Sequence, residues 1–369
     1  MRSVADLMQD APSEVERRRW CKHFDDFVHF SLALGNLDGA ACLARNRHRE
    51  MTDPASRKFL RDDDEIRVLA GDKLLGEPRF NPDGTIDIFR WSRPQYDGPS
   101  LRALACLSFL AAGGQPADEL VQLLKLDLDF TRRHAGHRCI GPWEEPGQNS
   151  HHYYVALVQF AALVHGRAWA GNAGQEWEAA ERTLRGALEQ HWSETHQVYV
   201  AMRPAPHGSA DDALDGAFLL AVLDADLPNG PHSVLDERVR TTQTAIEDFF
   251  KREFPINRMR AAPALGRYRG DRYFGGGAWY PITLAAAALN YRRARLPGQD
   301  RGALIERGDA FMATVRDLTP EDGALSEQVD RATGKQTSAR HLTWSYAAFI
   351  RAARARARAQ QGPYLKSRT

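Results

Sequence analysis

The 369-residue chain has only four cysteines and no long hydrophobic run, and both scarcities narrow the class of protein. Cys21, Cys42, Cys106 and Cys139 stand at no spacing typical of zinc ligands, and Cys106 lies inside an apolar stretch. We therefore expect free thiols, not a disulfide framework or a metal site. No run of about 18 apolar residues occurs, so no transmembrane helix is predicted.

An excess of one charge is also missing. Lys and Arg number 49 against 48 Asp and Glu, which gives a net charge of +1. A near-neutral chain lacks the basic face that binds nucleic acid or an anionic membrane, so neither partner is expected. The first ten residues hold no apolar core of signal-peptide length, which predicts a cytoplasmic protein unless a leader has been removed.

Strand-like alternation is almost absent, whereas helical periodicity recurs along the chain. Helices that are apolar on all sides, which pack in an interior, are followed by helices with one apolar stripe, which pack outside. The predicted interior helices, counting one after Trp20, are 24–34, 101–112, 153–170, 213–223, 278–291 and 342–355. Each follows a loop rich in polar and aromatic residues.

Alternating inner and outer helices predict an all-α (α/α)6 barrel. Inner helices of one polarity would gather their preceding loops at one end, where the helix N-termini add positive potential. An open α-solenoid is the alternative, but its repeats would share a fixed period, and none is visible. One domain is expected over 20–361, preceded at 1–19 by an extension or a short outer helix.

Two of the loops carry carboxylates. The loop Pro142-Trp-Glu-Glu145 opens an apolar helix, where a carboxyl group held against an indole would keep its proton near neutrality. Two solvated surface glutamates are the alternative interpretation. A second carboxylate, Glu327, lies in a distant loop. Two acids from distant loops in an aromatic-lined cavity predict general acid and base catalysis on a glycoside.

A third loop supplies groups that suit a sugar ring. Arg267, Tyr268, Asp271 and Trp279 stand among glycines that allow close backbone approach. Stacking on aromatic rings and forked hydrogen bonds are what such a ligand requires.

Four blocks of the sequence resemble the glucoamylase catalytic domain, glycoside hydrolase family 15. The longest runs from Ser326-Glu-Gln-Val-Asp-Arg to Thr343-Trp-Ser-Tyr-Ala-Ala348. The others are Gly76-Glu-Pro-Arg-Phe-Asn81 with Trp91-Ser-Arg-Pro-Gln-Tyr-Asp-Gly-Pro99, Pro142-Trp-Glu-Glu145, and Gly266-Arg-Tyr268 with Asp271, Tyr273 and Trp279. The resemblance covers about residues 20–355.

The resemblance implies a role for each matched residue. Glu144 would be the general acid and Glu327 the base that activates water. Glu145 and Arg267 would bind the sugar in the first subsite, between walls formed by Trp91 and Trp143. The remaining matched positions expected at the carbohydrate are Arg93, Tyr268, Asp271 and Trp279. The resemblance also implies inversion at the anomeric carbon, release of glucose from non-reducing ends, and no metal or cofactor.

One family motif departs from the pattern. Family members carry Trp-x-Arg-Asp at the start of an inner helix, where it holds the outer hydroxyls of the terminal glucose. The best match here is Trp20-Cys-Lys22-His23. Lys22 and His23 would favour an anionic or altered sugar, with Asp25 or Asp26 as substitutes in a shifted loop. The short segment before Trp20 also leads us to expect a shortened or missing first outer helix.

These observations predict an inverting hydrolase of a terminal α-glucosidic bond in a small intracellular carbohydrate. One alternative is a protein of the same fold that binds or processes a modified or anionic sugar without glucan hydrolysis. A glycosyl-transferring or tailoring enzyme is another. The sequence leaves the sugar, the linkage and the oligomeric state open.

Overall fold

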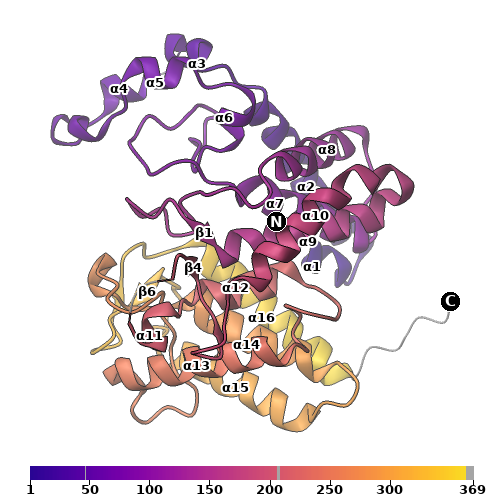
Figure 1. Cartoon of the computed structure of the whole chain (residues 1–369), viewed down its shortest axis with the longest axis vertical. Coiled ribbons are helices and arrows are strands. Elements are labelled where there is room, and N and C mark those ends of the chain that lie inside the picture. The colour runs from indigo at the N-terminus through magenta and orange to yellow at the C-terminus, as the bar shows by residue number, and fades with distance from the viewer. Residues whose placement is uncertain (46, 206–207, 363–369) are drawn as a thin grey trace. The chain divides into compact units, whose positions relative to one another are not determined.

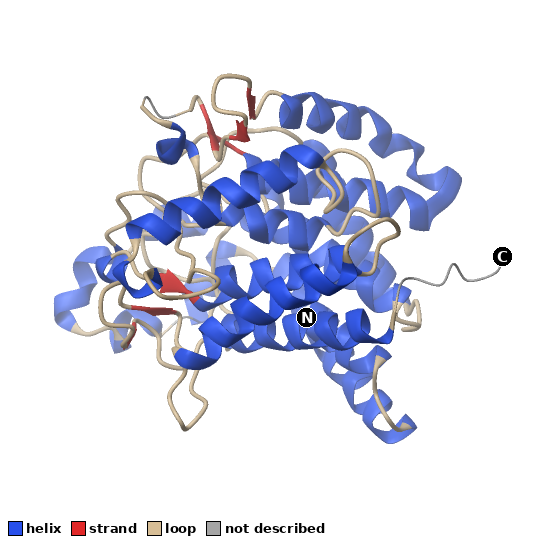
Figure 2. Ribbon diagram, turned by 90° about the horizontal axis from the view of Figure 1, so that it is seen from below, coloured by secondary structure: helices blue, strands red, loops and turns tan. Residues whose placement is uncertain are grey.

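A computed structural model describes residues 1–45, 47–205 and 208–362 (Figure 1). Helices dominate the structure (Figure 2). Each named strand is two residues long. The chain divides into two compact units, Met1–Ala187 and Leu188–Thr369, and each is described by itself. Over the described residues, no helix combines the length and the apolar character needed to cross a membrane.

The first unit is built around two buried helices. α7 (Gly98–Ala111) and α9 (Tyr153–Ala170) pack against each other, and every residue from Tyr153 to Leu163 is buried. α1 (Arg2–Gln9), only eight residues long, packs against α7. Because α7 and α9 are buried on several faces, both behave as the inner helices that the sequence predicts.

Amphipathic helices cover this pair. α8 (Asp118–Arg133) lies against α7 and α9, and its buried residues form one stripe that includes Leu120, Leu124 and Leu128. On α10 (Glu178–Glu189), the Arg185 guanidinium lies 5.4 Å from the centre of the Phe160 ring of α9. The remaining helices of this unit are α2 (Glu14–Gly35), α3 (Gly39–Arg45), α4 (His48–Met51), η1 (Pro54–Phe59), α5 (Asp63–Arg67), α6 (Gly71–Leu75) and η2 (Gly171–Trp177).

Helix α2 corrects the prediction for residues 24–34. It packs against α1 and α8, and only one stripe of it is buried, namely Phe24, Val28, Ser31 and Leu34. Phe30, expected in the interior, is 41% exposed. A one-sided stripe marks an outer helix, so the assignment of this helix to the inner layer is wrong. Its N-cap is Ser13, and the helix runs unbroken through the domain boundary that we expected before Trp20.

The second unit repeats the two layers. α14 (Tyr280–Ala294) is buried almost throughout and packs against both α12 (Ala217–Ala225) and α16 (Thr343–Gln361). α15 (Arg301–Asp317) covers α14, and α13 (Glu237–Glu253) contacts α12. Inner helices are therefore confirmed at α12 and α14. On α16 the buried residues are few and small: Ser345, Ala348, Ala352 and Ala359.

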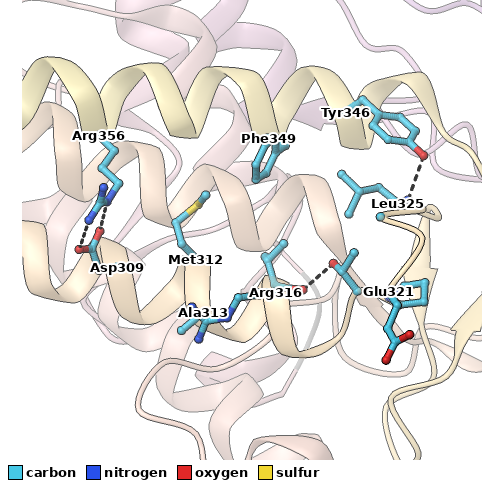
Figure 3. A pocket seen from close by; sticks show the side chains of 13 residues that line it. Asp309, Met312, Ala313, Arg316, Glu321, Leu325, Tyr346, Phe349 and Arg356 are labelled. Carbon is cyan, nitrogen blue, oxygen red and sulfur yellow. Dashed lines mark hydrogen bonds and ion pairs between the residues drawn. The ribbon is translucent and has the colours of Figure 1, made fainter.

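A cavity of about 880 Å³ lies between α15 and α16 (Figure 3). Its walls are mainly apolar and include Met312, Leu325 and Phe349. At one end, Arg356 donates two hydrogen bonds to Asp309, from Nε at 2.6 Å and from Nη2 at 2.8 Å. Tyr346 of the longest family-like block lines this cavity, but none of the predicted catalytic or sugar-binding residues does.

Short strands fix the loops of the second unit. β5 (Ala278–Trp279), β6 (Gln328–Val329) and β7 (Gln336–Thr337) form an antiparallel sheet in the order β5–β6–β7. This sheet ties the loop before α14 to the loop before α16. The other small elements are β1 (His151–His152), β2 (Trp192–Ser193), β3 (Val198–Tyr199), β4 (Met202–Arg203), α11 (Ala210–Ala213), η3 (Pro255–Asn257) and η4 (Tyr273–Gly275).

Candidate active site

The Glu144 loop begins and ends at a pair of hydrogen bonds. The N–H of Cys139 donates to the carbonyl of Ser150 at 3.0 Å, and the N–H of Ser150 donates back at 2.8 Å. Gly141 has φ +66°, and a Cβ there would lie 2.5 Å from Nδ1 of His152, so only glycine fits. Glu144 itself has φ 56°, a left-handed conformation that non-glycine residues seldom adopt and that clusters at functional sites.

A guanidinium group holds the Glu144 carboxylate. Arg79 donates from Nε to Oε2 of Glu144 at 3.1 Å, and the same guanidinium lies 3.8 Å from the centre of the Trp91 ring. Trp91 is fixed in turn because its indole N–H donates to Asp87 at 2.9 Å. Sequence reasoning singled out Trp91 and Glu144 but not Arg79, although Arg79 stands inside a block that resembles the family.

Arg93 is hydrogen-bonded to Glu77 and Phe89, which precede Trp91 in the chain. Its Nε donates to Glu77 at 2.7 Å, and its Nη2 donates to the carbonyl of Phe89 at 3.0 Å. Glu77 is buried and also accepts a hydrogen bond from Arg61 at 2.9 Å. The guanidinium of Arg93 is thus hydrogen-bonded to protein acceptors in and near the Trp91 segment, and its binding of a sugar stays a prediction.

Trp143 and Glu145 flank Glu144 and are partly buried. The side-chain amide of Gln148 donates to Oε2 of Glu145 at 3.1 Å. The carbonyl of Gln148 accepts a hydrogen bond from Nε2 of His152 at 2.9 Å. These contacts link the carboxylate of Glu145 to the start of α9. We refer to Arg79, Trp91, Trp143, Glu144 and Glu145 as the Glu144 cluster.

In the second unit, the three-stranded sheet positions Glu327. Glu327 immediately precedes β6 and Ser338 immediately follows β7, and the pairing of these strands brings the two side chains together. The hydroxyl of Ser338 donates a hydrogen bond to Oε2 of Glu327, and Ser338 has φ +64°. The backbone N–H of Glu327 donates to the carbonyl of Ala339 at 2.9 Å. Ser338 lies inside the longest block that resembles the family, but nothing local in the sequence marks it as a partner of Glu327.

Arg267 is the centre of an aromatic group in the same unit. Its guanidinium lies 5.1 Å from the ring centre of Tyr268, 5.2 Å from that of Tyr273 and 5.4 Å from that of Trp279. Both Arg267 and Asp271 are buried, and Nε of Arg267 donates to Asp271 at 2.8 Å. The sequence-predicted residues Arg267, Tyr268, Asp271 and Trp279 are thus brought together.

A close backbone contact fixes Asp271. Gly276 has φ +66°, and a Cβ there would lie 2.1 Å from the carbonyl oxygen of Asp271. Only glycine at position 276 leaves room for the backbone of Asp271. Asp271 in turn orients Arg267 through its carboxylate. We refer to Arg267, Tyr268, Trp279, Glu327 and Ser338 as the Glu327 cluster.

Trp20, Lys22 and His23 do not have the placement that we expected. They lie inside α2, which begins at Glu14, and the Trp20 and His23 rings are 5.7 Å apart. The Nζ of Lys22 pairs with Asp26 at 2.9 Å, and these side chains are 75% and 58% exposed. The prediction that this motif opens an inner helix is therefore wrong. The expectation of an anionic sugar loses the support of that placement and stays a prediction.

All four cysteines are free thiols, as the sequence predicts. Burial raises the pKa of Cys106 to about 12 and that of Cys139 to about 11, so both thiols are neutral at physiological pH. Within the described ranges, no group of three His, Cys, Asp or Glu side chains is arranged to hold a metal ion.

Solved structures define the fold class. The glucoamylase of Saccharomycopsis fibuligera matches with a TM-score of 0.79 at 22% identity, over 97% of this chain and 84% of its own. The Hormoconis resinae glucoamylase matches with a TM-score of 0.77 at 24% identity, over 98% of this chain and 65% of its own. The chain thus has the (α/α)6 barrel fold of these proteins, which confirms the predicted class.

Sequence comparison then gives the family. The model of the glycosyl hydrolases family 15 matches residues 63–354, and the chain belongs to that family. Glucoamylase 1 of Rhizopus oryzae is 28% identical in an alignment of 339 positions that covers 77% of this chain and 56% of that protein. Glucoamylase-1 of Schizophyllum commune is 28% identical over 76% of this chain and 57% of its own length. The chain therefore spans about half the length of the curated relatives that it matches.

Proposed function

We propose that this protein hydrolyses a terminal α-glucosidic bond with inversion at the anomeric carbon. The observation that carries the proposal is that two carboxylates each stand in a built cluster, one with a guanidinium partner and one with a hydroxyl donor. Membership of family 15 and relatives named as glucoamylases support the same reaction.

Glu144 acts as the general acid. Its carboxyl proton passes to the glycosidic oxygen as the bond between that oxygen and the anomeric carbon breaks. Glu144 is left as a carboxylate, and Arg79 already lies 3.1 Å from its Oε2. A charge-assisted hydrogen bond that is preformed stabilises this product of proton transfer without any rearrangement.

Glu327 acts as the general base. It takes one proton from a water molecule whose oxygen bonds to the anomeric carbon from the face opposite the leaving group. The hydroxyl of Ser338 orients the Glu327 carboxylate through a single donated hydrogen bond. One proton is gained at Glu327 and one is lost at Glu144, so solvent exchange restores both groups after each turnover.

The other members of each cluster are groups that suit a sugar ring. Arg267, oriented by Asp271, and Glu145 donate to and accept from its hydroxyls, and Trp91, Trp143, Tyr268 and Trp279 supply aromatic faces. Arg93 acts indirectly, through the loop that carries Trp91. The exposed ion pair of Lys22 and Asp26 has no part in this scheme.

The test is an activity screen that also reads stereochemistry. Purified protein is incubated with maltose, isomaltose, trehalose, dextrin, soluble starch and aryl α-glucosides, and the product anomer is followed by NMR. Release of β-glucose is expected from at least one α-glucoside. A small cytoplasmic substrate, which the sequence predicts, would give faster turnover of maltose than of soluble starch. Initial release of α-glucose, or no glucose from any of these compounds, would contradict the proposal.

A further inference from the structure

The first turn of α16 is hydrogen-bonded to the segment that leads to Glu327. The hydroxyl of Ser345 donates to the carbonyl of Ser326 at 2.7 Å, one residue before Glu327. The hydroxyl of Tyr346 accepts a hydrogen bond from the backbone N–H of Leu325 at 3.1 Å (Figure 3). Two consecutive side chains of one helix thus hold the backbone of the two residues that precede the carboxylate.

These contacts are sheltered and reinforced. Ser345 and Ser326 are both fully buried, so water cannot take the place of the hydrogen bond between them. The backbone N–H of Leu342, the N-cap residue of α16, donates to the carbonyl of Leu325 at 3.1 Å. The hydroxyl of Tyr346 is fixed in turn, because Nδ1 of His341 lies 2.9 Å from it.

Packing does not hold this segment on the side of Leu325. Leu325 and Tyr346 both line the cavity of about 880 Å³ between α15 and α16. Side chains that face a cavity lack partner atoms on that side, so they lose the dispersion contacts that fix close-packed residues. The hydrogen bonds from α16 therefore fix the backbone where packing does not.

The position of this backbone matters because a general base must lie within hydrogen-bond reach of the water that it activates. Ser338 and Ala339 hold Glu327 from the strand that follows it in the sheet. Ser345 and Tyr346 hold the chain just before Glu327. A misplacement of about 1 Å at a catalytic group can cost roughly a hundredfold in rate.

We infer that Ser345 and Tyr346 are positioning residues that set the place of the Glu327 carboxylate. Neither side chain exchanges a proton with the water or the sugar. Their hydrogen bonds fasten Leu325 and Ser326 to α16, which packs against α14 and α15. The inference rests on the role of Glu327 as general base in the proposed function.

The chain offers matched variants. Ser345→Ala removes one buried hydroxyl, and Tyr346→Phe removes the phenol oxygen but keeps the ring. Thr314→Val is the control for Ser345→Ala, because Thr314 is also buried in the second unit and its hydroxyl also donates to a backbone carbonyl, that of Ala262, at 2.7 Å. Both variants lose one such hydrogen bond, but that of Ser345 ends next to Glu327.

The first measurement is steady-state kinetics on maltose and on an aryl α-glucoside. Ser345→Ala and Tyr346→Phe should each lower kcat roughly tenfold on both substrates, because the base acts on water whatever the leaving group. KM should stay within about twofold, since Arg267 and Tyr268 lie on another loop. Thr314→Val should keep the kcat of the unmodified protein. A loss confined to maltose, an equal loss in Thr314→Val, or full kcat in Ser345→Ala and Tyr346→Phe would overturn the inference.

The second measurement does not depend on activity. Hydrogen exchange of residues 324–330 is followed by mass spectrometry, because the backbone N–H of Glu327 is bonded to Ala339 and reports how firmly the segment is held. Exchange should be roughly tenfold faster in Ser345→Ala and unchanged in Thr314→Val. If Ser345→Ala does not fold, Tyr346→Phe should show the same acceleration. Equal exchange in the variants and the unmodified protein would sink the inference. A protein that hydrolyses no glucoside yet shows the acceleration would refute the proposed function and leave the positioning intact.

Discussion

Arg79 reaches across 65 residues of sequence to place its Nε 3.1 Å from Oε2 of Glu144. The same guanidinium stacks on Trp91, so a cation, an aromatic ring and a carboxylate form one contact group. A planar guanidinium can make both contacts at once, whereas an ammonium is a compact point charge. Arg79 therefore contacts the Trp91 face and, in the proposed mechanism, also meets the charge that Glu144 develops.

Loss of Arg79 is the first prediction. Arg79→Leu should lower kcat on maltose about tenfold, because a charge-assisted hydrogen bond contributes about 1.5 kcal/mol or more to the stability of the charged form. The value is at the low end because the side chain of Arg79 is 46% exposed. Steady-state kinetics would measure it. Arg90→Leu breaks a nearby exposed pair with Asp62 and should leave kcat unchanged; equal losses in both variants would contradict the role of Arg79.

The two glutamates should respond differently to the leaving group. Glu144→Gln should abolish turnover of maltose but retain much of the turnover of an aryl α-glucoside, which departs with little protonation. Glu327→Gln should abolish both, because water activation is needed for either substrate. Rates of glucose and phenol release would be compared across the variants. A Glu144→Gln protein equally inactive on both substrates would show that Glu144 is not the acid.

Gly275 and Gly276 provide a comparison of backbone strain with steric clash. Both have positive φ, 86° and 66°, so an alanine at either position adopts an unfavourable conformation. Only at Gly276 would the new Cβ meet another atom, the carbonyl oxygen of Asp271 at 2.1 Å. We expect Gly276→Ala to raise KM by displacing Asp271 and hence Arg267, and to cost more stability than Gly275→Ala. Kinetics and urea unfolding of both variants test this, and indistinguishable variants would contradict it.

Asp309 should make folding stability depend on pH. Hydrogen bonds from Arg356, as the largest cause, and from Tyr291 lower the pKa of Asp309 below its unfolded value of about 4 (Figure 3). A lowered folded pKa means that the stabilisation is complete above the unfolded pKa and is lost as pH falls through the folded pKa. Asp309→Asn should therefore cost stability at pH 7 and little at pH 2.5.

The expected cost of Asp309→Asn is about 1 kcal/mol at pH 7, because the two side chains of the ion pair are 36% and 41% exposed. Urea unfolding at the two pH values would measure it. Asp317→Asn on the same helix is the control, since its ion pair with Arg260 has one donor at 3.1 Å, and it should cost less. A larger effect at pH 2.5 than at pH 7 would reverse the sign and refute the argument.

Most of the helical layers could be predicted from the sequence. α9, α12 and α14 are apolar on every face, and such a pattern has only one stable environment. The error at α2 has a physical cause. Phe27, Phe30 and Leu32 enrich the helix in apolar residues, but Phe30 points away from the stripe that packs, and richness alone does not identify an inner helix.

Candidate site residues could be predicted from the sequence where the side chain itself is reactive. Residues that matter only because they contact such a side chain could not. Glu144 and Glu327 stand out as carboxylates in aromatic loops. Arg79 and Ser338 become partners of those carboxylates only through the loop packing of one unit and the β6–β7 pairing of the other.

The hydrogen bonds between Cys139 and Ser150 close the Glu144 loop at its base, so the loop could be replaced by one of another length. Both ends of the excursion are fixed at one point, so its length and composition can change without displacing α9. The tip at Pro146 and Gly147 is exposed, and a Cβ at Gly147 would meet no atom within 4 Å. Insertions at the tip would therefore lengthen the loop beside Glu144 while its anchoring points stay where they are. If Glu144 has the proposed role, grafting longer versions of this loop is a direct route to altering which leaving groups the protein accepts.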